Sequence, residues 1–103
     1  MTLLIPKRQI IRDKKYRRYV ASLPCMACGY PYCQCAHISA GNYARGMKAS
    51  DELCIPLCPT RLFTVGCHEW FDRAQEFFAD EVLGMTIDEL KAHAQSMYRE
   101  WAA

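Results

Sequence analysis

Hydrophobic positions follow helical spacing in three parts of the chain. Over residues 12–23, aromatic and aliphatic side chains recur every three to four positions, and Lys and Arg occupy the remaining face. The same spacing starts again at Cys67 and continues until Gly84 interrupts it. The sequence TIDE at 86–89 is a capping box, which predicts a last helix as far as Trp101. The pattern therefore predicts one basic helix followed, in the last third of the chain, by two more helices.

The middle of the chain carries turn residues and two short hydrophobic segments. Residues 25–35 (CMACGYPYCQC) are dense in Cys, Gly, Pro and Tyr, which is typical of a turn-rich knuckle. Residues 36–39 predict a short strand, and residues 53–58 (LCIPLC) predict a second one, in which Pro56 favours an edge position. The two Gly and two basic residues of 41–50 predict an exposed loop between these strands. We therefore expect an α+β fold, with an N-terminal and a C-terminal helix flanking the strands.

Composition confines the chain to a small domain. Its 103 residues are 51% hydrophobic and 23% charged, and at this length a single core is barely sufficient for stability. We expect residues 1–103 to form one domain, in which the seven Cys add stability through a metal site or disulfides. Residues 1–15 lack the apolar core of a secretory signal and no stretch suits a membrane span, so a cytoplasmic location is expected. Thiols stay reduced there, and the odd number of Cys also favours a metal.

Two cysteines at C-x2-C spacing predict half of a tetrahedral zinc site. Cys25 and Cys28 are one tight turn apart, and Gly29 is free to take the positive φ that such a turn requires. The second pair is expected from Cys58 and Cys67, because the first ends a predicted strand and the second begins a predicted helix. A structural Zn²⁺ on these four thiolates would cross-link the small core.

The other three cysteines have competing explanations. Cys54 lies inside the second predicted strand, where a buried thiol behaves as a small apolar residue, so packing is favoured over ligation. Cys33 and Cys35 form a C-x-C pair, which can replace Cys58 or Cys67 in the zinc shell. The sequence leaves this replacement open.

A second group of side chains predicts a catalytic metal. His68 and Asp72 are four residues apart on a predicted helix, so they share one face and can hold one divalent ion. Two protein ligands leave positions open for water and substrate, as a catalytic metal requires. His37, on the first predicted strand, is a candidate general base near neutral pH, although an isolated His is more often a structural hydrogen-bonding residue.

Charge is distributed unevenly along the chain. The formal net charge is +2, yet residues 1–20 hold seven basic side chains and one acidic one, whereas residues 69–103 hold three basic and eight acidic ones. A basic segment suits a polyanionic partner such as DNA, although a well-solvated basic helix explains the same pattern. Residues 1–11 are expected to form a basic, partly flexible arm. The candidate DNA contacts on the first helix are Lys14, Lys15, Arg17 and Arg18.

Four sequence segments together resemble the HNH endonucleases, also called ββα-metal or His-Me finger nucleases. In order they are LPCMACG, AHI, GMKASDELCIPLC and CHEWFD, and the resemblance extends from Arg12 to about Trp101. It is strongest to the small phage-encoded and prophage-encoded members, including the recombination-enhancement nucleases. The resemblance implies a ββα-metal finger with a Cys zinc knuckle, and it implies metal-dependent hydrolysis of phosphodiester bonds in DNA.

The resemblance also implies roles for individual residues. His37 falls on the first His segment of the family and is assigned as general base, although a shift of one residue in register would make it a metal ligand. Asp51 falls on a position often filled by Asn, which implies a contact across the ββ loop or an orienting contact to the base. His68 falls on the last His of the signature, with Asp72 one turn later, and these two are the implied ligands of a catalytic Mg²⁺, Mn²⁺ or Zn²⁺.

The implied partner is DNA, with no membrane association, and a recombinase or another phage protein can be required as well. Arg45 and Lys48, on the predicted loop, are implied phosphate contacts, although two solvated loop cations explain them equally well. The alternative is a non-catalytic zinc-knuckle DNA-binding protein with a degenerate HNH site. It arises because Ala36 stands where relatives carry a second functional residue before His37.

Overall fold

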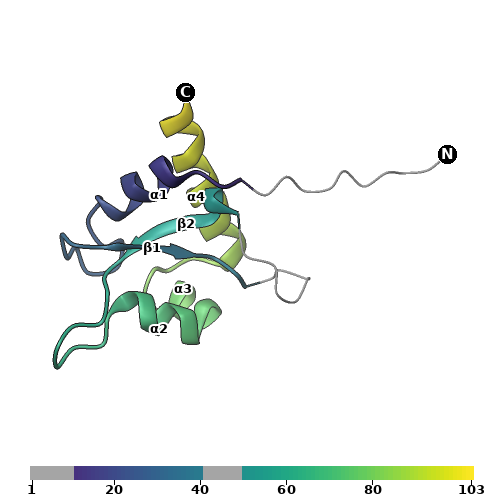
Figure 1. The fold of residues 1–103 in the computed structure, drawn as a ribbon. Coiled ribbons are helices and arrows are strands. Elements are labelled where there is room, and N and C mark those ends of the chain that lie inside the picture. The colour runs from purple at the N-terminus through teal and green to yellow at the C-terminus, as the bar shows by residue number, and fades with distance from the viewer. Residues whose placement is uncertain (1–10, 41–49) are drawn as a thin grey trace.

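The computed structural model describes residues 11–40 and 50–103, which form four α-helices and a two-stranded antiparallel sheet (Figure 1). The elements in chain order are α1 (Lys14–Ala21), β1 (Gln34–His37), the 3-10 helix η1 (Asp51–Leu53), β2 (Cys54–Leu57), α2 (Cys67–Arg73), α3 (Gln75–Glu81) and α4 (Ile87–Ala102). The α+β class is therefore confirmed. The predicted basic arm up to residue 10 and the loop residues Arg45 and Lys48 lie outside the described residues.

The sheet is short, and its register decides which side chains share a face. Gln34 of β1 lies opposite Leu57 of β2, and His37 lies opposite Cys54. The predicted range of the first strand, 36–39, is wrong by two residues. Pairing with β2 ends at His37. The next N–H, that of Ile38, donates to Leu53 O (2.8 Å), but Leu53 belongs to η1 and no longer to the strand.

The larger hydrophobic core covers the face of the sheet that carries Ala36, Ile55 and Leu57. These three side chains are fully buried, as expected for alternate positions on one face of paired strands. Helices α2, α3 and α4 cover this face, and their fully buried residues are Phe71, Phe78, Ala79, Leu90 and Ala94. All four residues of β2 are buried, because the opposite face is covered as well.

Helix α1 and the last turns of α4 cover the opposite face. Tyr16 and Val20 of α1 are fully buried with Cys54 of β2, and the Tyr16 ring packs against Tyr98 (4.8 Å between centroids) and Trp101 (5.1 Å). Helix α1 is shorter than the predicted 12–23. It begins after Asp13, whose carboxylate accepts the Tyr16 N–H (3.0 Å), and it ends before Ser22, two residues ahead of Pro24.

Two helices, α2 and α3, stand where a single helix is predicted from Cys67 to Gly84. Ala74 leaves helical geometry (φ −154°, ψ 67°) and separates α2 from α3. The next residue, Gln75, turns its amide toward the end of β1: Oε1 accepts the N–H groups of Ser39 (2.8 Å) and Ala40 (2.7 Å), and Nε2 donates to His37 O (3.1 Å). The Gln75 side chain thus supplies hydrogen-bond partners to backbone groups at the end of β1 and just after it.

The predicted capping box at the start of the last helix is confirmed. The Thr86 hydroxyl accepts the Glu89 N–H (3.1 Å), and the Glu89 carboxylate accepts the Thr86 N–H (3.0 Å). Helix α4 then continues to Ala102, one residue beyond the predicted end. In the described ranges, none of the helices combines the length and apolar character needed to cross a membrane.

Candidate functional site

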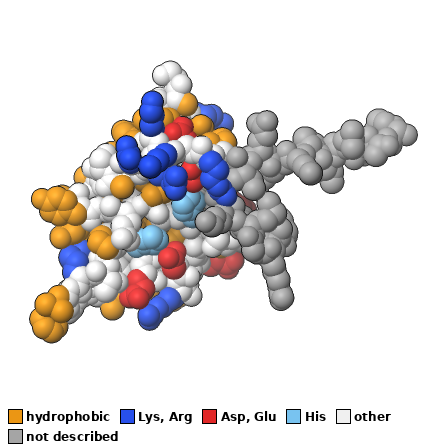
Figure 2. All heavy atoms as spheres, viewed as in Figure 1, with side chains coloured by type: hydrophobic (Ala, Val, Ile, Leu, Met, Phe, Trp, Pro, Cys, Tyr) orange, Lys and Arg blue, Asp and Glu red, His pale blue; other side chains and the backbone are white. Residues whose placement is uncertain are grey.

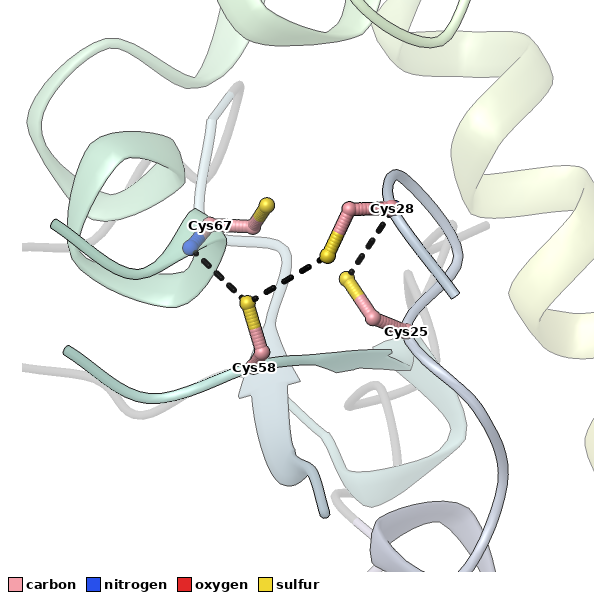
Figure 3. Close-up of side chains that lie close together, drawn as sticks. All are labelled: Cys25, Cys28, Cys58 and Cys67. Carbon is pink, nitrogen blue, oxygen red and sulfur yellow. Dashed lines mark hydrogen bonds between the residues drawn. The ribbon is translucent and has the colours of Figure 1, made fainter. Parts of the chain in front are cut away.

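Four cysteines from three separate segments converge on one point, as Figure 3 shows. Cys25 and Cys28 come from the knuckle before β1, Cys58 follows β2, and Cys67 begins α2. Their four Sγ atoms all lie within 4.8 Å of one another. The pairing of the C-x2-C knuckle with Cys58 and Cys67 is therefore the arrangement predicted from the sequence.

Backbone hydrogen bonds hold the knuckle in place. The Cys25 carbonyl accepts the Gly29 N–H (2.8 Å), and Gly29 takes a positive φ of 80°, the conformation that a glycine adopts without strain. The Cys28 N–H donates to Cys25 Sγ (3.5 Å). The Met26 N–H donates to Pro56 O (2.9 Å), which fixes the knuckle beside β2. The knuckle therefore presents both thiols next to the end of β2, where Cys58 lies.

A tight turn closes the nine-residue excursion between Cys58 and Cys67. Arg61 and Thr64 exchange backbone hydrogen bonds of 2.8 and 2.9 Å, so the chain reverses and returns to the end of β2. The Cys67 N–H then donates to Cys58 Sγ (3.4 Å). The Arg61 guanidinium lies 3.7 Å from the centroid of the Tyr30 ring, so the turn also packs against the knuckle. This turn makes the distant Cys67 a neighbour of the other three thiols.

The sulfur positions fit a tetrahedral zinc ion. Zn–S bonds of about 2.3 Å in a tetrahedron place neighbouring sulfurs about 3.8 Å apart. The Cys28 and Cys58 sulfurs are 3.7 Å apart. Cys25 and Cys58 are buried, Cys67 is half-buried and Cys28 is exposed. The geometry is therefore compatible with a closed structural site for a metal such as Zn²⁺.

The pKa values of these thiols are shifted in both directions. Burial would raise the pKa of Cys25, but hydrogen bonds from the knuckle amides outweigh it and lower that pKa to about 7. At Cys58, burial is likewise outweighed, by the Cys67 amide and Arg61, so its pKa is also lowered. At Cys67, burial and then the hydrogen bond with Cys58 raise the pKa. Two thiols therefore ionise readily, whereas the set of four thiolates needs a cation to balance its charge.

Gly66 is the position in the closing turn that has no room for a side chain. A Cβ on Gly66 would overlap the carbonyl of Pro59 and the nitrogen of Thr60, which are backbone atoms that cannot rotate away. We expect Gly66→Ala to displace Cys67 and to weaken zinc binding by about 10- to 100-fold, measured by competition with a chelator. Thr64→Ala, at an exposed position of the same turn, is the control and should bind zinc normally. Equal zinc affinity in Gly66→Ala would show that the close approach is unimportant.

The remaining cysteines lie outside the four-thiol cluster. Cys33 donates its thiol to Tyr30 O (3.2 Å), and Cys35 points to the opposite face of the sheet, where it packs with the buried Cys54. Within the described ranges, neither Cys33 nor Cys35 therefore replaces Cys58 or Cys67. Packing, the role favoured for Cys54, agrees with its complete burial beside Tyr16.

His37 and Asp51 form a direct pair at the end of β1. The distance between His37 Nε2 and Asp51 Oδ1 is 2.9 Å, and the His37 side chain keeps 34% of its surface exposed. Because a carboxylate only accepts hydrogen bonds, Nε2 is the donor in this pair, and in the neutral ring Nδ1 then keeps its lone pair. Of the two contacts implied for Asp51, the structure contains the one to His37.

The buried Asp51 carboxylate connects β1 to the start of α1. Its Oδ2 accepts the Asp13 N–H (2.7 Å) and lies 3.2 Å from the Arg17 Nε. Burial would raise the pKa of Asp51, but the bonds to His37, the Asp13 amide and Arg17 together lower it. A lowered pKa in the folded protein means that Asp51 stabilises the fold above the unfolded pKa of about 4 and loses this effect as the pH falls through the folded pKa.

We expect Asp51→Asn to destabilise the fold by about 1–3 kcal/mol at pH 7, because the neutral amide loses the charge opposite Arg17 and its NH2 group must face either the Asp13 N–H or His37 Nε2, where the carboxylate accepts a hydrogen bond. Urea unfolding at constant zinc measures this change. Asp80→Asn, on the exposed surface of α3, is the matched control and should change stability by less than about 0.5 kcal/mol. Equal stability of the two variants would contradict this connecting role of Asp51.

His68 and Asp72 form a second pair on α2. His68 Nε2 lies 3.3 Å from Asp72 Oδ2, and His68 Nδ1 lies 2.8 Å from Gln34 Oε1 at the start of β1. Together with Gln34, this pair lines an open recess of about 390 Å³, which also borders Pro59 and Glu69. Four-residue helical spacing therefore places the two side chains as predicted.

The two pairs lie at opposite ends of β1. Gln34, which holds His68, and His37, which holds Asp51, are three residues apart, or about 10 Å along a strand. The structure therefore brings His37 to Asp51 and His68 to Asp72, but it gives no direct bond between the pairs. On the face drawn in Figure 2, His side chains lie between a group of Lys and Arg and a group of Asp and Glu.

Sequence reasoning misses three residues that position the site. Gln34 fixes His68, Gln75 binds the chain beyond β1, and Arg17 holds Asp51, although Arg17 is predicted as a DNA contact. The other predicted contacts on α1, Lys14, Lys15 and Arg18, are exposed. Only the buried position of Gln75 leaves a sequence signal, because a polar residue there interrupts the apolar face of the predicted helix.

Comparisons with known proteins place the chain in a family. The model of a family described as a protein of unknown function, DUF968, matches residues 1–81. Over 55 residues, or 52% of this chain, the sequence is 40% identical to the uncharacterized protein YdfU of Escherichia coli strain K12, and the match spans 16% of that relative. No solved structure matches the chain significantly. Since the family model covers residues 1–81, well over half of the chain, the chain belongs to the DUF968 family.

Proposed function

We propose that the protein is a metal-dependent DNA endonuclease of the HNH, or ββα-metal, type. The observation that carries the proposal is the His37–Asp51 pair (2.9 Å) on a β1–β2–α2 unit whose helix bears His68 and Asp72. These elements occur in the order that the ββα-metal finger requires, with the candidate base on the first strand and the candidate ligands on the helix. The four-Cys cluster would fasten the strands to the start of α2.

His37 is the proposed general base. Asp51 holds Nε2–H, which fixes the tautomer and leaves Nδ1 free to take a proton from water. The buried carboxylate would also stabilise the imidazolium that forms, since His37 gains a positive charge 2.9 Å from it. Asp51 keeps its own orientation through the Asp13 amide and Arg17. The proposed role of Asp51 is therefore to position the base, without touching DNA.

His68 and Asp72 are the proposed ligands of a catalytic divalent ion. Nδ1 of His68 donates to Gln34 Oε1, so in the neutral ring Nε2 carries a lone pair. This lone pair faces the Asp72 carboxylate across 3.3 Å, so two acceptors lie side by side with no proton between them. A cation between them would resolve this arrangement. A bound Mg²⁺, Mn²⁺ or Zn²⁺ would act there as a Lewis acid on the scissile phosphate and the departing oxygen. The recess beside this pair offers space for a phosphate group.

Helix α1 is the proposed DNA contact surface. Lys14, Lys15 and Arg18 are exposed, whereas Arg17 is engaged by Asp51 and Tyr16 is buried, so the exposed cations can be changed without disturbing the core. From the sequence resemblance to small phage-encoded and prophage-encoded HNH endonucleases, we also propose that the protein is of the phage or prophage type. Its proposed partner is DNA, and its proposed process is recombination. The loop cations Arg45 and Lys48 remain proposed contacts outside the described residues.

Salt dependence tests the role of α1. Each phosphate neutralised on duplex DNA adds about 0.9 to the slope of log affinity against log salt concentration. We expect the triple variant Lys14→Gln, Lys15→Gln, Arg18→Gln to bind DNA more weakly and with a slope reduced by up to about 2.7. Fluorescence anisotropy over a salt series measures the slope. Lys91→Gln on α4 is the control, and the same slope in the triple variant as in wild type would exclude these cations as DNA contacts.

A non-catalytic zinc-knuckle DNA-binding protein is the second candidate, and one observation favours it. Ala36, which precedes His37, is fully buried in the larger core, so this position supplies neither a ligand nor a base. The catalytic ion would then have only two protein ligands. On this alternative, the four-Cys cluster and α1 bind DNA without cutting it.

Incubation of the zinc-loaded protein with supercoiled plasmid separates the two candidates. We expect nicking when Mg²⁺ or Mn²⁺ is added, and we expect none when the catalytic ion is withheld while the structural zinc is retained. A mobility shift with an intact plasmid under all metal conditions would favour the DNA-binding protein. Cleavage that does not depend on a divalent ion would contradict the proposed mechanism.

A further inference from the structure

Among the residues that the structure describes, a second set of soft ligands lies on the α1 side of the sheet. Cys35 and His37 of β1 and Cys54 of β2 offer two Sγ atoms and a ring nitrogen, all within 4.8 Å of one another. This set shares no residue with the four-Cys cluster, which lies beyond the ends of the strands and holds the knuckle to α2. Cys54 is fully buried, whereas Cys35 and His37 are half-buried, so solvent reaches the set from the β1 side.

The register of the sheet favours a shared ion over a disulfide. His37 lies opposite Cys54, and Cys35 lies opposite Pro56, so Cys35 and Cys54 are diagonal neighbours. Diagonal neighbours on antiparallel strands have Cα atoms about 7–8 Å apart, whereas a disulfide usually requires less than about 7 Å. A metal ion tolerates this separation, because its ligand sulfurs need to approach only to about 3.8 Å.

A buried hydroxyl beside this set has no hydrogen-bond partner within the described part of the chain. Tyr16 is fully buried, packs against Cys54 and Cys35, and leaves its hydroxyl unpaired. A phenol hydroxyl can donate a hydrogen bond to a thiolate. An unpaired buried hydroxyl is costly, and a metal-bound thiolate would be a strong acceptor for it.

We propose that Cys35, His37 and Cys54 form a second binding site for a thiophilic divalent ion such as Zn²⁺. Two thiolates and one imidazole are a ligand set that zinc accepts, with a fourth position open to water. Because Asp51 holds Nε2 of His37, the nitrogen that binds the ion is Nδ1, and the carboxylate behind the ring is the support that metal-bound histidines usually have.

Occupation of this site would regulate the proposed nuclease, and this consequence rests on the proposed function. Nδ1 of His37 is both the atom that would bind the ion and the atom that would accept the proton from water. The two roles exclude each other, so zinc in excess of the structural equivalent would inhibit cleavage. The site is therefore an inhibitory zinc site that acts on the candidate base, His37.

Cobalt titration of the reduced, metal-free full chain tests the binding itself. Co²⁺ bound by thiolates gives a sulfur-to-metal charge-transfer band, which a His68–Asp72 site cannot produce. We expect two thiolate-bound equivalents in wild type, and only the first in Cys35→Ser and in Cys54→Ala. Cys33→Ser, at a half-buried thiol outside both sets, is the control and should keep both. A single equivalent in wild type, or a second equivalent that persists in Cys35→Ser, would overturn the proposal.

A separate measurement tests the regulatory consequence. Excess Zn²⁺ should slow plasmid cleavage by wild type and by Cys33→Ser, and Cys35→Ser should resist this inhibition. Two cobalt equivalents in a protein that cuts no DNA would uphold the binding site and reject the proposed function. If the protein binds two cobalt equivalents but excess Zn²⁺ does not slow cleavage, the proposed inhibition by zinc is wrong.

Discussion

Replacement of Cys25 by Ser is expected to leave the chain largely unfolded. Cys25 is a buried member of the four-thiol cluster, which joins the knuckle, the end of β2 and the start of α2. Structural zinc contributes about 10–16 kcal/mol of apparent binding free energy in zinc-finger peptides, which is as large as the total stability of a typical domain, about 5–15 kcal/mol. Circular dichroism and zinc content of the purified variant measure the effect, and removal of zinc from wild type by a chelator should reproduce it.

The control for this prediction is Cys33→Ser, because Cys33 donates to Tyr30 O outside the cluster. This variant should fold and retain one tightly bound zinc under stoichiometric loading. Cys58→Ser should behave like Cys25→Ser. A folded Cys58→Ser protein with a full zinc complement would show that Cys33 or Cys35 takes its place, and a folded, zinc-free wild type would reject the structural metal altogether.

Loss of His68 is expected to abolish binding of the catalytic ion. With two protein ligands, His68 and Asp72, removal of one leaves a single carboxylate, which is insufficient to hold Mn²⁺ in competition with water. His68→Ala should therefore show no Mn²⁺ binding by calorimetry, and Asp72→Asn should bind more weakly while keeping the shape of the side chain. His37→Ala should bind Mn²⁺ like wild type, because its partner is Asp51.

The outcome for His37→Ala decides the register of the first His segment. If this variant alone lost Mn²⁺ binding, His37 would be a ligand rather than the base. Glu76→Gln, on the exposed surface of α3, is a control for a general loss of negative charge near α2. Normal Mn²⁺ binding by His68→Ala and Asp72→Asn would remove both residues from the candidate site.

The four-Cys cluster was predictable because local spacing carries most of the information. The C-x2-C turn with Gly29 determines one half of the site, and the ends of two predicted elements bring Cys58 and Cys67 to the other half. Likewise, four-residue spacing on a helix places His68 beside Asp72, and the capping box at Thr86 marks the start of α4.

The remaining features depend on contacts between residues far apart in the sequence. The break at Ala74 follows from hydrogen bonds of Gln75 to residues 35 to 38 positions away, which no helical pattern contains. The bounds of β1 follow from its pairing with β2. Arg17 resembles any other cation of a basic helix until the fold places Asp51 against it. The Cys35–His37–Cys54 set appears only when the register of the sheet is known.

The proposed role of His37 as general base is best tested by single-turnover cleavage of a labelled DNA duplex. Wild type and His37→Ala are compared at equal zinc content and at saturating Mn²⁺. A positioned general base contributes about 10²–10⁴ to the rate. We predict that wild type cuts the duplex and that His37→Ala cuts it slower by this factor while binding DNA and Mn²⁺ equally well. Equal rates for the two proteins would contradict the role of His37 as general base, and no cleavage by wild type would contradict the proposed nuclease activity.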